Sequence, residues 1–453
     1  MTATRRTWPY HALGLRSVRR RPPGGRGPGT PPDDGLSVLL VEFSPSGGLY
    51  QFAYQQGEAL AARGHRVDLL TGPEPELAAR VPGMTVTPAL PTWHPADGAG
   101  DAAVVRKVRR AWRAVRYVAA WRAVARHVRA HRPDVVQWSN WRFALDGRRV
   151  ERLAREVRRW PRPPVLAYIA HSPRPFNEQR RDGRVFKDGG ALERGLRRGY
   201  AAMDVVFALG PDSARDLREH FPECGRVAVV PHGDEDVFLT DEPDPGDDGP
   251  VVLFFGTVQA YKGVDVLVEA FAEVRRRVPG ARLVIAGAAS GEVDTEELER
   301  RAGEIGGVRL RLGYVPVPEV GPLVRAARVV ALPYRNANAS GVAHLAHSFA
   351  RAVVTTSVGD LPTAVEDGAT GLVVPPDDSL ALADALTTLL TDPARAAKMG
   401  AAGRTSLSER ASWQDIAQRM ETEFTAAAAP PERAAGHRPN GPTAARPDGS
   451  GGR

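Results

Sequence analysis

Residues 251–263, VVLFFGTVQAYKG, combine residue types that can hold an anion. The apolar run at the start predicts a buried strand, Gly256 ends it, and Lys262 follows within a short turn that closes at Gly263. The next residues, VDVLVEAFAEV, have apolar side chains at helical spacing. The amides of a helix start and a fixed ammonium group can together bind a phosphate. The alternative is an ordinary strand–turn–helix connection with a solvated lysine.

Three other turns follow predicted strands and have residues suited to a ligand site. In SPSGGLYQF, Gly47 and Gly48 precede a helix, so the backbone can approach a ligand closely. His171 leaves the strand PVLAYIA into a proline-rich loop, and Ser340 and Gly341 open a helix whose amides can face an anion. The alternatives are a plain tight turn for the glycines and a capping role for the histidine.

Alternating strands and helices position these turns. One series begins at LSVLLVEF and ends at RVAVVP, and a second runs from VVLFFG to a helix near residues 378–390. The Pro/Asp/Gly-rich stretch TDEPDPGDDGP (240–250) separates them. Two such series predict two doubly wound, Rossmann-like α/β domains. Ligands bind at the carboxyl ends of parallel strands, so we expect the site in the cleft between the domains.

The predicted organisation has five parts. Residues 1–34 and 428–453 are rich in Pro, Gly, Arg or Ala and are predicted to be disordered tails, because they can bury little apolar surface. The two domains are assigned to residues 35–240 and 241–408. A last helix is assigned to residues 409–427.

Composition indicates a cytoplasmic protein without a structural disulfide. Among 453 residues Cys224 is the single cysteine, which excludes an internal disulfide and a multi-cysteine zinc site and fits a reducing cytosol. The arginine-rich N-terminus lacks the apolar core of a secretory signal. No apolar run has the length needed to span a bilayer.

The net charge of +8 comes largely from local blocks of arginine. No nucleic-acid-binding motif accompanies them, so we predict no nucleic-acid partner. Residues 102–133 have ten basic residues and no acid, and they predict one long helix. Its arginines suggest weak docking at the inner face of an anionic membrane, where a lipid-linked acceptor would be found. We favour the alternative, in which the arginines are solvated and an apolar stripe packs on the sheet; the stripe consists of Val104, Val108, Trp112, Val115, Val118, Trp121, Val124 and Val128.

Taken in order, the segments SPSGGLYQFAYQQGEALAARGHRVDLLT, RPDVVQW, YIAHSPRP, VVPHGDEDVF, FFGTVQAYKGVDVLVEAF, LVIAGAASGE, LGYVPVPEVGPLVRAARVVALPY and SGVAHLAHSFARAVVTTSVGDLPTAVEDGATGLVVPPDD resemble glycosyltransferase family 4. They extend over most of residues 36–392. The resemblance implies the GT-B fold and transfer of a sugar, with retention, from a nucleotide-sugar donor to an acceptor hydroxyl. It implies no metal and no cofactor. RASWQDIAQRMETEF (410–424) resembles the family's C-terminal helix, which crosses back onto the N-terminal domain.

The resemblance also assigns roles to residues. Lys262 matches the lysine on the donor phosphate, and His171 matches the histidine that contacts the transferring sugar; these are the expected catalytic residues. The glycine turn matches the one near the phosphate and the acceptor, and the helix start after residue 339 matches the loop whose amides face the donor. The expected donor-binding residues are Gly47, Gly48, Gly256, Thr257, Lys262, Ser340, Gly341 and Val342.

The chain departs from the family pattern at three positions. Thr257 stands where an arginine is usual, and Ala337 and Leu345 stand where two glutamates are usual. A branch of the family with a Y…SGV…A pattern lacks the glutamates, and this segment resembles that branch. A desolvated charged contact contributes about 1.5–3 kcal/mol, so losing one phosphate-binding cation weakens the expected donor site. The alternative function is a non-catalytic GT-B protein that acts as a binding or regulatory subunit.

Aromatic residues near predicted strand ends of the first domain are the candidates for the unknown acceptor's site. These are Trp93, Trp138 and Trp141, whose rings can stack on a sugar or on another flat acceptor. Burial in the core is the alternative for each.

Overall fold

The computed structural model describes residues 35–93, 103–173, 190–239, 249–290, 293–338 and 340–429, without the side chains of residues 103–110. The residues that the structure describes form one compact unit. The predicted tails fall almost entirely outside the described residues, as does most of the predicted linker at 240–250.

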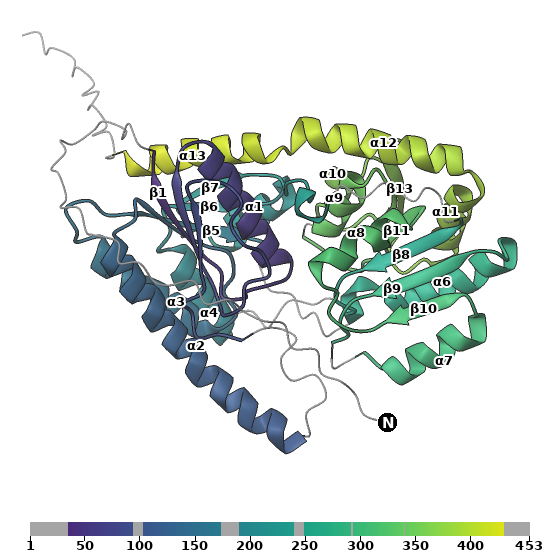
Figure 1. The fold of residues 1–453 in the computed structure, drawn as a ribbon, viewed down its shortest axis with the longest axis horizontal. Helices are drawn as coiled ribbons and strands as arrows, with labels where there is room; N and C mark the ends of the chain where they lie inside the picture. Colours follow the sequence, from purple (N-terminus) through teal and green to yellow (C-terminus); the bar gives the residue numbers. More distant parts are fainter. Residues whose placement is uncertain are drawn as a thin grey trace, which may run out of the picture. The chain divides into compact units, whose positions relative to one another are not determined.

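The first sheet has seven parallel strands in the order β3-β2-β1-β4-β5-β6-β7 (Figure 1). Every strand is short and most are buried on both faces, as expected for a sheet covered by helices on either side. The strands are β1 (Ser37–Val41), β2 (Arg66–Leu70), β3 (Met84–Thr87), β4 (Val135–Trp138), β5 (Val165–Ala170), β6 (Val205–Ala208) and β7 (Arg226–Val229).

The helices connected to this sheet are α1 (Gly48–Ala62), α2 (Ala103–His131), α3 (Ala144–Val157), α4 (Ala191–Tyr200) and α5 (Pro211–His220). In α3 the buried apolar residues Val150, Leu153, Ala154 and Val157 follow helical spacing and form one face. The strand β3 and the helix α5 are absent from our sequence-based series.

The second sheet has six parallel strands in the order β10-β9-β8-β11-β12-β13. They are β8 (Val251–Phe255), β9 (Arg282–Ala286), β10 (Val308–Arg311), β11 (Val329–Leu332), β12 (Ala352–Thr356) and β13 (Gly371–Val374). Its helices are α6 (Val264–Arg277), α7 (Thr295–Ile305), α8 (Val317–Arg325), α9 (Gly341–Ser348), α10 (Leu361–Ala364), α11 (Ser379–Thr391) and α12 (Pro393–Arg410), with 3-10 turns η1 (Asp236–Phe238) and η2 (Ala260–Lys262). The predicted pair of doubly wound sheets is therefore confirmed.

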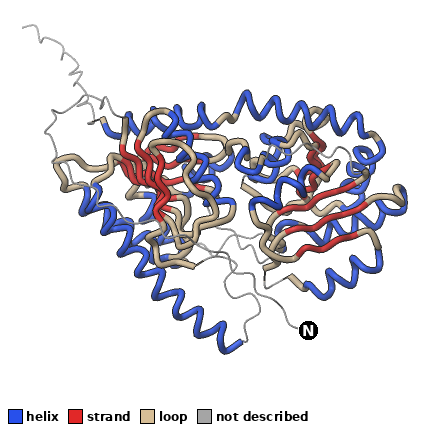
Figure 2. Tube along the Cα trace, in the orientation of Figure 1, coloured by secondary structure: helices blue, strands red, loops and turns tan. Residues whose placement is uncertain are grey.

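The last helix, α13 (Trp413–Ala428), packs against α1 and the strands β5 and β6 of the first sheet (Figure 2). Phe424 meets the ring of Phe207 edge-on, with the ring centroids 5.6 Å apart. At the surface of this contact Arg63 pairs with Glu421 at 2.7 Å. The chain thus returns to its first sheet after completing the second.

The strand order reverses between β1 and β4 in the first sheet and between β8 and β11 in the second. In open parallel sheets such reversals mark where ligands bind, at the carboxyl ends of the strands. The turns that begin at Gly47 and at Gly256 follow two of these strands. None of the helices in the described part of the chain combines the length and the apolarity needed to cross a membrane.

Candidate active site

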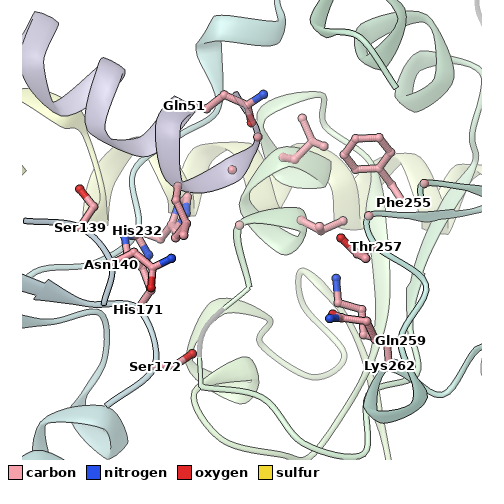
Figure 3. Close-up of a pocket in the computed structure, with 18 of the residues that line it drawn as sticks. Gln51, Ser139, Asn140, His171, Ser172, His232, Phe255, Thr257, Gln259 and Lys262 are labelled. Atoms are coloured by element: carbon pink, nitrogen blue, oxygen red, sulfur yellow. The ribbon is translucent and has the colours of Figure 1, made fainter. Parts of the chain in front are cut away.

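A cavity of about 840 Å³ lies at the carboxyl ends of the strands, with residues of both sheets in its walls. Figure 3 shows Ser139, Asn140 and His171 on one side of it, with Thr257 and Lys262 on the other. Nine of the residues predicted from the sequence line this cavity: Gly47, Gly48, Trp141, His171, Gly256, Thr257, Lys262, Gly341 and Val342.

Backbone geometry at the end of β8 brings Lys262 to the cavity wall. Gly256 has a φ of 111°, a region that favours glycine, and its backbone packs directly on Gly287. Gly263 has a φ of 65°, and a Cβ there would lie 2.0 Å from the carbonyl oxygen of Pro333. These two glycines let the turn η2 fold close to the sheet. As a result the Nζ of Lys262 lies 3.2 Å from where a Cβ on Gly256 would stand.

The start of α9 adjoins this lysine wall. Val342 reaches within 3.8 Å of the same Cβ position on Gly256, and Gly341 also lines the cavity. Ser340 is the N-cap residue of α9, but it lines a smaller neighbouring cavity of about 240 Å³. The predicted donor loop is thus divided between two cavities.

The glycine turn before α1 has a carboxylate at its amide. Gly47 has a φ of 85°, and its N–H donates to Glu76 at 3.3 Å. The amide of Gln51 donates to the same carboxylate at 3.2 Å, and the hydroxyl of Tyr314 donates to its other oxygen. Glu76 and Tyr314 were not predicted from the sequence. The position of Glu76 in the loop after β2, at the carboxyl edge of the sheet, is the signal that could have found it.

His171 follows β5 and faces the cavity as a neutral imidazole. Its ring meets Phe52 edge-on, with centroids 4.9 Å apart. Burial, and secondarily the imidazole of His232, lowers the pKa of His171 to about 3. Its Nε2 is buried and has no hydrogen-bond partner among the described residues. A ligand hydroxyl at this nitrogen would satisfy a polar atom that is costly to leave unpaired.

Two further cavity residues, His232 and Glu235, come from the loop between β7 and η1 and were missed from the sequence. Burial lowers the pKa of His232 to about 4, so this imidazole is also neutral near pH 7. The carboxyl of Glu235 accepts a hydrogen bond from the amide of Gln55 at 3.1 Å. The segment VVPHGDEDVF holds both residues, yet nothing in its local pattern indicates that they reach the cavity.

The three tryptophans proposed for the acceptor lie in different surroundings. Trp141 lines the cavity and stacks on Tyr168, with ring centroids 3.9 Å apart. Trp138 is fully buried in the core and stacks on Trp121. Trp93 lies away from the cavity, under the guanidinium of Arg113. Only Trp141 is therefore placed where it can touch a ligand in the cavity.

Positive charge is sparse in the cavity. Among the described residues that line it, Lys262 and Arg142 are the only lysine and arginine. Arg142 follows β4, on the wall opposite Lys262. Ala337 and Leu345, at the positions of the family glutamates, are both buried. Within the described part of the chain, no group of three or more His, Cys, Asp or Glu side chains could hold a metal ion.

The exposed side chain of Thr257 permits a gain-of-function prediction. We expect Thr257→Arg to tighten nucleoside-diphosphate binding roughly tenfold, because it adds a charged contact beside Lys262. Isothermal titration measures this, with Thr257→Met as the control that adds bulk without charge. A loss of affinity in the arginine variant alone would mean that another cation already fills the space.

Two parallel Rossmann-like sheets with a cavity at their carboxyl ends define the GT-B class of proteins. Comparison with known families agrees with this assignment. The family described as "Glycosyl transferases group 1" matches residues 249–392, and the "Glycosyl transferase 4-like domain" matches residues 47–233. The chain belongs to glycosyltransferase family 4.

Relatives span nearly the whole chain. The D-inositol 3-phosphate glycosyltransferase of Xylanimonas cellulosilytica is 32% identical over 432 residues, which cover 88% of this chain and 96% of the relative. The enzyme of the same name from Mycolicibacterium paratuberculosis is 30% identical over 401 residues, covering 80% and 83% of the two chains.

Solved structures share the fold. Sucrose-phosphate synthase from Thermosynechococcus elongatus superposes with a TM-score of 0.64 at 21% identity, covering 85% of this chain and 98% of that one. Anabaena HepE, in complex with UDP and glucose, superposes with a TM-score of 0.60 at 18% identity, covering 86% and 99%.

Proposed function

We propose that the protein transfers a sugar from a nucleotide-sugar donor to an acceptor hydroxyl, with retention of configuration and without a metal ion. The observation that supports this most is the placement of Lys262 beside Gly256 and the start of α9 in one cavity. An ammonium group and helix-start amides can stabilise the charge that develops on a leaving diphosphate. In this proposal they do the work that a metal ion does in other transferases.

The facing wall suits the transferring sugar and the acceptor. The unpartnered Nε2 of His171 can hydrogen-bond a sugar hydroxyl, and Trp141 offers a ring for stacking. Because His171 is neutral, we assign it an orienting hydrogen bond and not a proton transfer. The relatives are named for D-inositol 3-phosphate, so this compound is the first acceptor to assay.

A panel of nucleoside diphosphates tests the donor. We expect one of them to raise the thermal unfolding temperature of the protein, because a ligand that binds only the folded state stabilises it. Hydrolysis or transfer of the matching nucleotide sugar, without added divalent metal and with excess chelator, then separates an enzyme from a non-catalytic binding protein. Binding without turnover would favour the non-catalytic alternative, and a requirement for metal would contradict the metal-independent part of the proposal.

We further propose that the protein is cytoplasmic and makes peripheral contact with an anionic membrane through α2. The helices α2, α3 and α4 together contain sixteen Lys and Arg residues against four acids. The apolar stripe predicted for α2 is divided: Trp121, Val124 and Val128 are buried, whereas Trp112 and Val115 are 61% and 59% exposed. An exposed aromatic and aliphatic pair among arginines suits the interface of an anionic bilayer.

Vesicle co-sedimentation tests this contact. We expect the protein to bind vesicles that contain phosphatidylglycerol and to bind phosphatidylcholine vesicles weakly, because the arginines attract anionic headgroups. The assay is done at low salt, since salt screens this attraction. Replacing Trp112 and Val115 by serine should weaken binding roughly tenfold, since apolar burial is lost. Leu380→Ser removes an equally exposed apolar residue from α11 and serves as the control. Equal binding to both lipids at low salt, or an equal loss in the control, would contradict the proposal.

A further inference from the structure

The carboxyl of Glu235 is buried in the wall of the cavity and held in a fixed position. The residue is only 5% exposed, yet it lines the cavity together with His232. The amide of Gln55 donates to its Oε2 at 3.1 Å, and its own backbone N–H donates to the hydroxyl of Ser348 at 2.9 Å. Gln55 is itself fixed, because its oxygen accepts from the backbone N–H of Val237 at 3.3 Å. One carboxyl oxygen is thus anchored by an amide from the first sheet's α1.

The other oxygen faces the start of α9. A Cβ on Gly341 would lie 3.2 Å from the Oε1 of Glu235 and 2.9 Å from the Nε2 of His232. Glycine at position 341 therefore leaves room between α9 and these two side chains. The next residue, Val342, points to the opposite neighbour, Gly256 with Lys262.

These contacts place the cavity groups in one row. Lys262 lies on one side of the α9 start, and Glu235 with His232 lies on the other. His232 and His171 both meet the ring of Phe52 edge-on, with centroids 5.1 Å and 4.9 Å away. If the diphosphate binds at Lys262, the sugar attached to it extends past the α9 start toward Glu235 and the two imidazoles.

The same part of the cavity has no carboxylate from the α9 loop. The positions where the family usually has glutamates are Ala337 and Leu345, and both are buried. Leu345 lines the cavity with an apolar side chain. A carboxyl group nevertheless reaches the start of α9, from the loop between β7 and η1.

We propose that Glu235 binds hydroxyl groups of the transferring sugar, in place of the carboxylates that the α9 loop lacks. This inference rests on the proposed function, because it requires a sugar joined to the nucleotide at Lys262. Sugar hydroxyls both donate and accept hydrogen bonds, and a carboxyl group offers a matching acceptor or, when protonated, a donor. The neighbouring His232 and His171 are neutral and add hydrogen-bonding atoms without charge.

The protonation of Glu235 gives this role a pH signature. Burial raises the pKa of Glu235 to about 8; the hydrogen bond from Gln55 lowers it, and the charges of Asp234 and Asp236 raise it further. From α9, the ring of His344 packs on His232 and is also neutral, because burial lowers its pKa. Donor affinity should therefore change between pH 7 and 9 as Glu235 loses its proton.

The experiment compares Glu235→Ala and Glu235→Gln with Glu219→Gln, the same chemical change at an exposed acid of α5 that does not line the cavity. Titration calorimetry measures the affinity for the nucleotide sugar and for the free nucleoside diphosphate that the wild type binds. We expect Glu235→Ala to lose about tenfold or more in affinity for the nucleotide sugar while keeping its affinity for the diphosphate. Glu235→Gln should retain part of the affinity and lose its change between pH 7 and 9.

Two outcomes would overturn the inference. Equal losses of affinity for the nucleotide sugar and the diphosphate would show that Glu235 has a structural role. An unchanged pH dependence of donor affinity in Glu235→Gln would show that the Glu235 carboxyl does not bind the sugar. Glu219→Gln should match the wild type in both measurements, and equal losses in this variant would also count against a specific role for Glu235. If the wild type binds no nucleotide sugar, the proposed function itself fails, which is distinguishable from a failure at Glu235.

Discussion

Replacing Lys262 by alanine is expected to lower the rate of sugar transfer about a hundredfold and to weaken nucleoside-diphosphate binding. Among the described residues that line the cavity, the other cation is Arg142, which lies on the opposite wall, and Thr257 stands where a second phosphate-binding cation is usual. Removing a group that stabilises developing charge in a buried site costs about 10²–10³-fold in rate. Steady-state kinetics and calorimetry measure the two losses.

The control for this prediction is Lys398→Ala, which removes an exposed lysine from α12. Both variants should unfold at the temperature of the wild type, because neither ammonium group is buried in the core. Wild-type turnover and nucleotide affinity in Lys262→Ala would contradict the assignment of the phosphate site.

His171→Ala is expected to reduce the turnover number about tenfold to a hundredfold while leaving nucleoside-diphosphate affinity close to that of the wild type. The imidazole lies on the wall opposite Lys262, and its buried Nε2 has no hydrogen-bond partner among the described residues. A hydrogen bond that strengthens in the transition state accelerates the chemical step without tightening ground-state binding. Because the pKa of His171 is about 3, its ionisation should not shape the rate between pH 6 and 8.

His131→Ala, which changes an exposed histidine at the end of α2, is the matched control. The decisive comparison is the turnover number at saturating donor against the dissociation constant of the diphosphate. A variant that binds the nucleotide weakly but turns over normally at saturation would show that His171 serves nucleotide binding and not the sugar.

The fold was predictable because its signals are local and repeated. Buried strands such as Val251–Phe255 read as short apolar runs, and the glycine turn with Lys262 follows one of them directly. The positions of Gly47, His171 and Gly256 at strand ends were enough to expect them at the carboxyl edges of the two sheets, which face the cleft. The strand β3 and the helix α5 were missed, since MTVT and PDSARDLREH each contain only two apolar residues apart from proline, too few to show a period.

The rest of the site depends on contacts between distant segments. Glu235 becomes a cavity residue because Gln55, 180 positions away, holds its carboxyl beside Gly341. The apolar spacing predicted one continuous stripe along α2. It does not show which part of the helix the sheet covers, so the buried Trp121 and the exposed Trp112 could not be told apart from the sequence. Trp138 could not be told from Trp141 for the same reason, because burial is decided by which neighbours the fold supplies.

The return of α13 to the first sheet has a consequence for anyone who recombines this protein with a relative. A chimera made with a single crossover between β7 and β8 would bring a foreign α13 onto α1, and it would test the Arg63–Glu421 and Phe207–Phe424 pairs against unmatched partners. A double crossover that exchanges only residues 249–410 would keep α13 with the sheet it covers. The double-crossover chimera should take on the donor preference of the relative. In the single-crossover chimera, a change in donor preference could not be separated from misfolding.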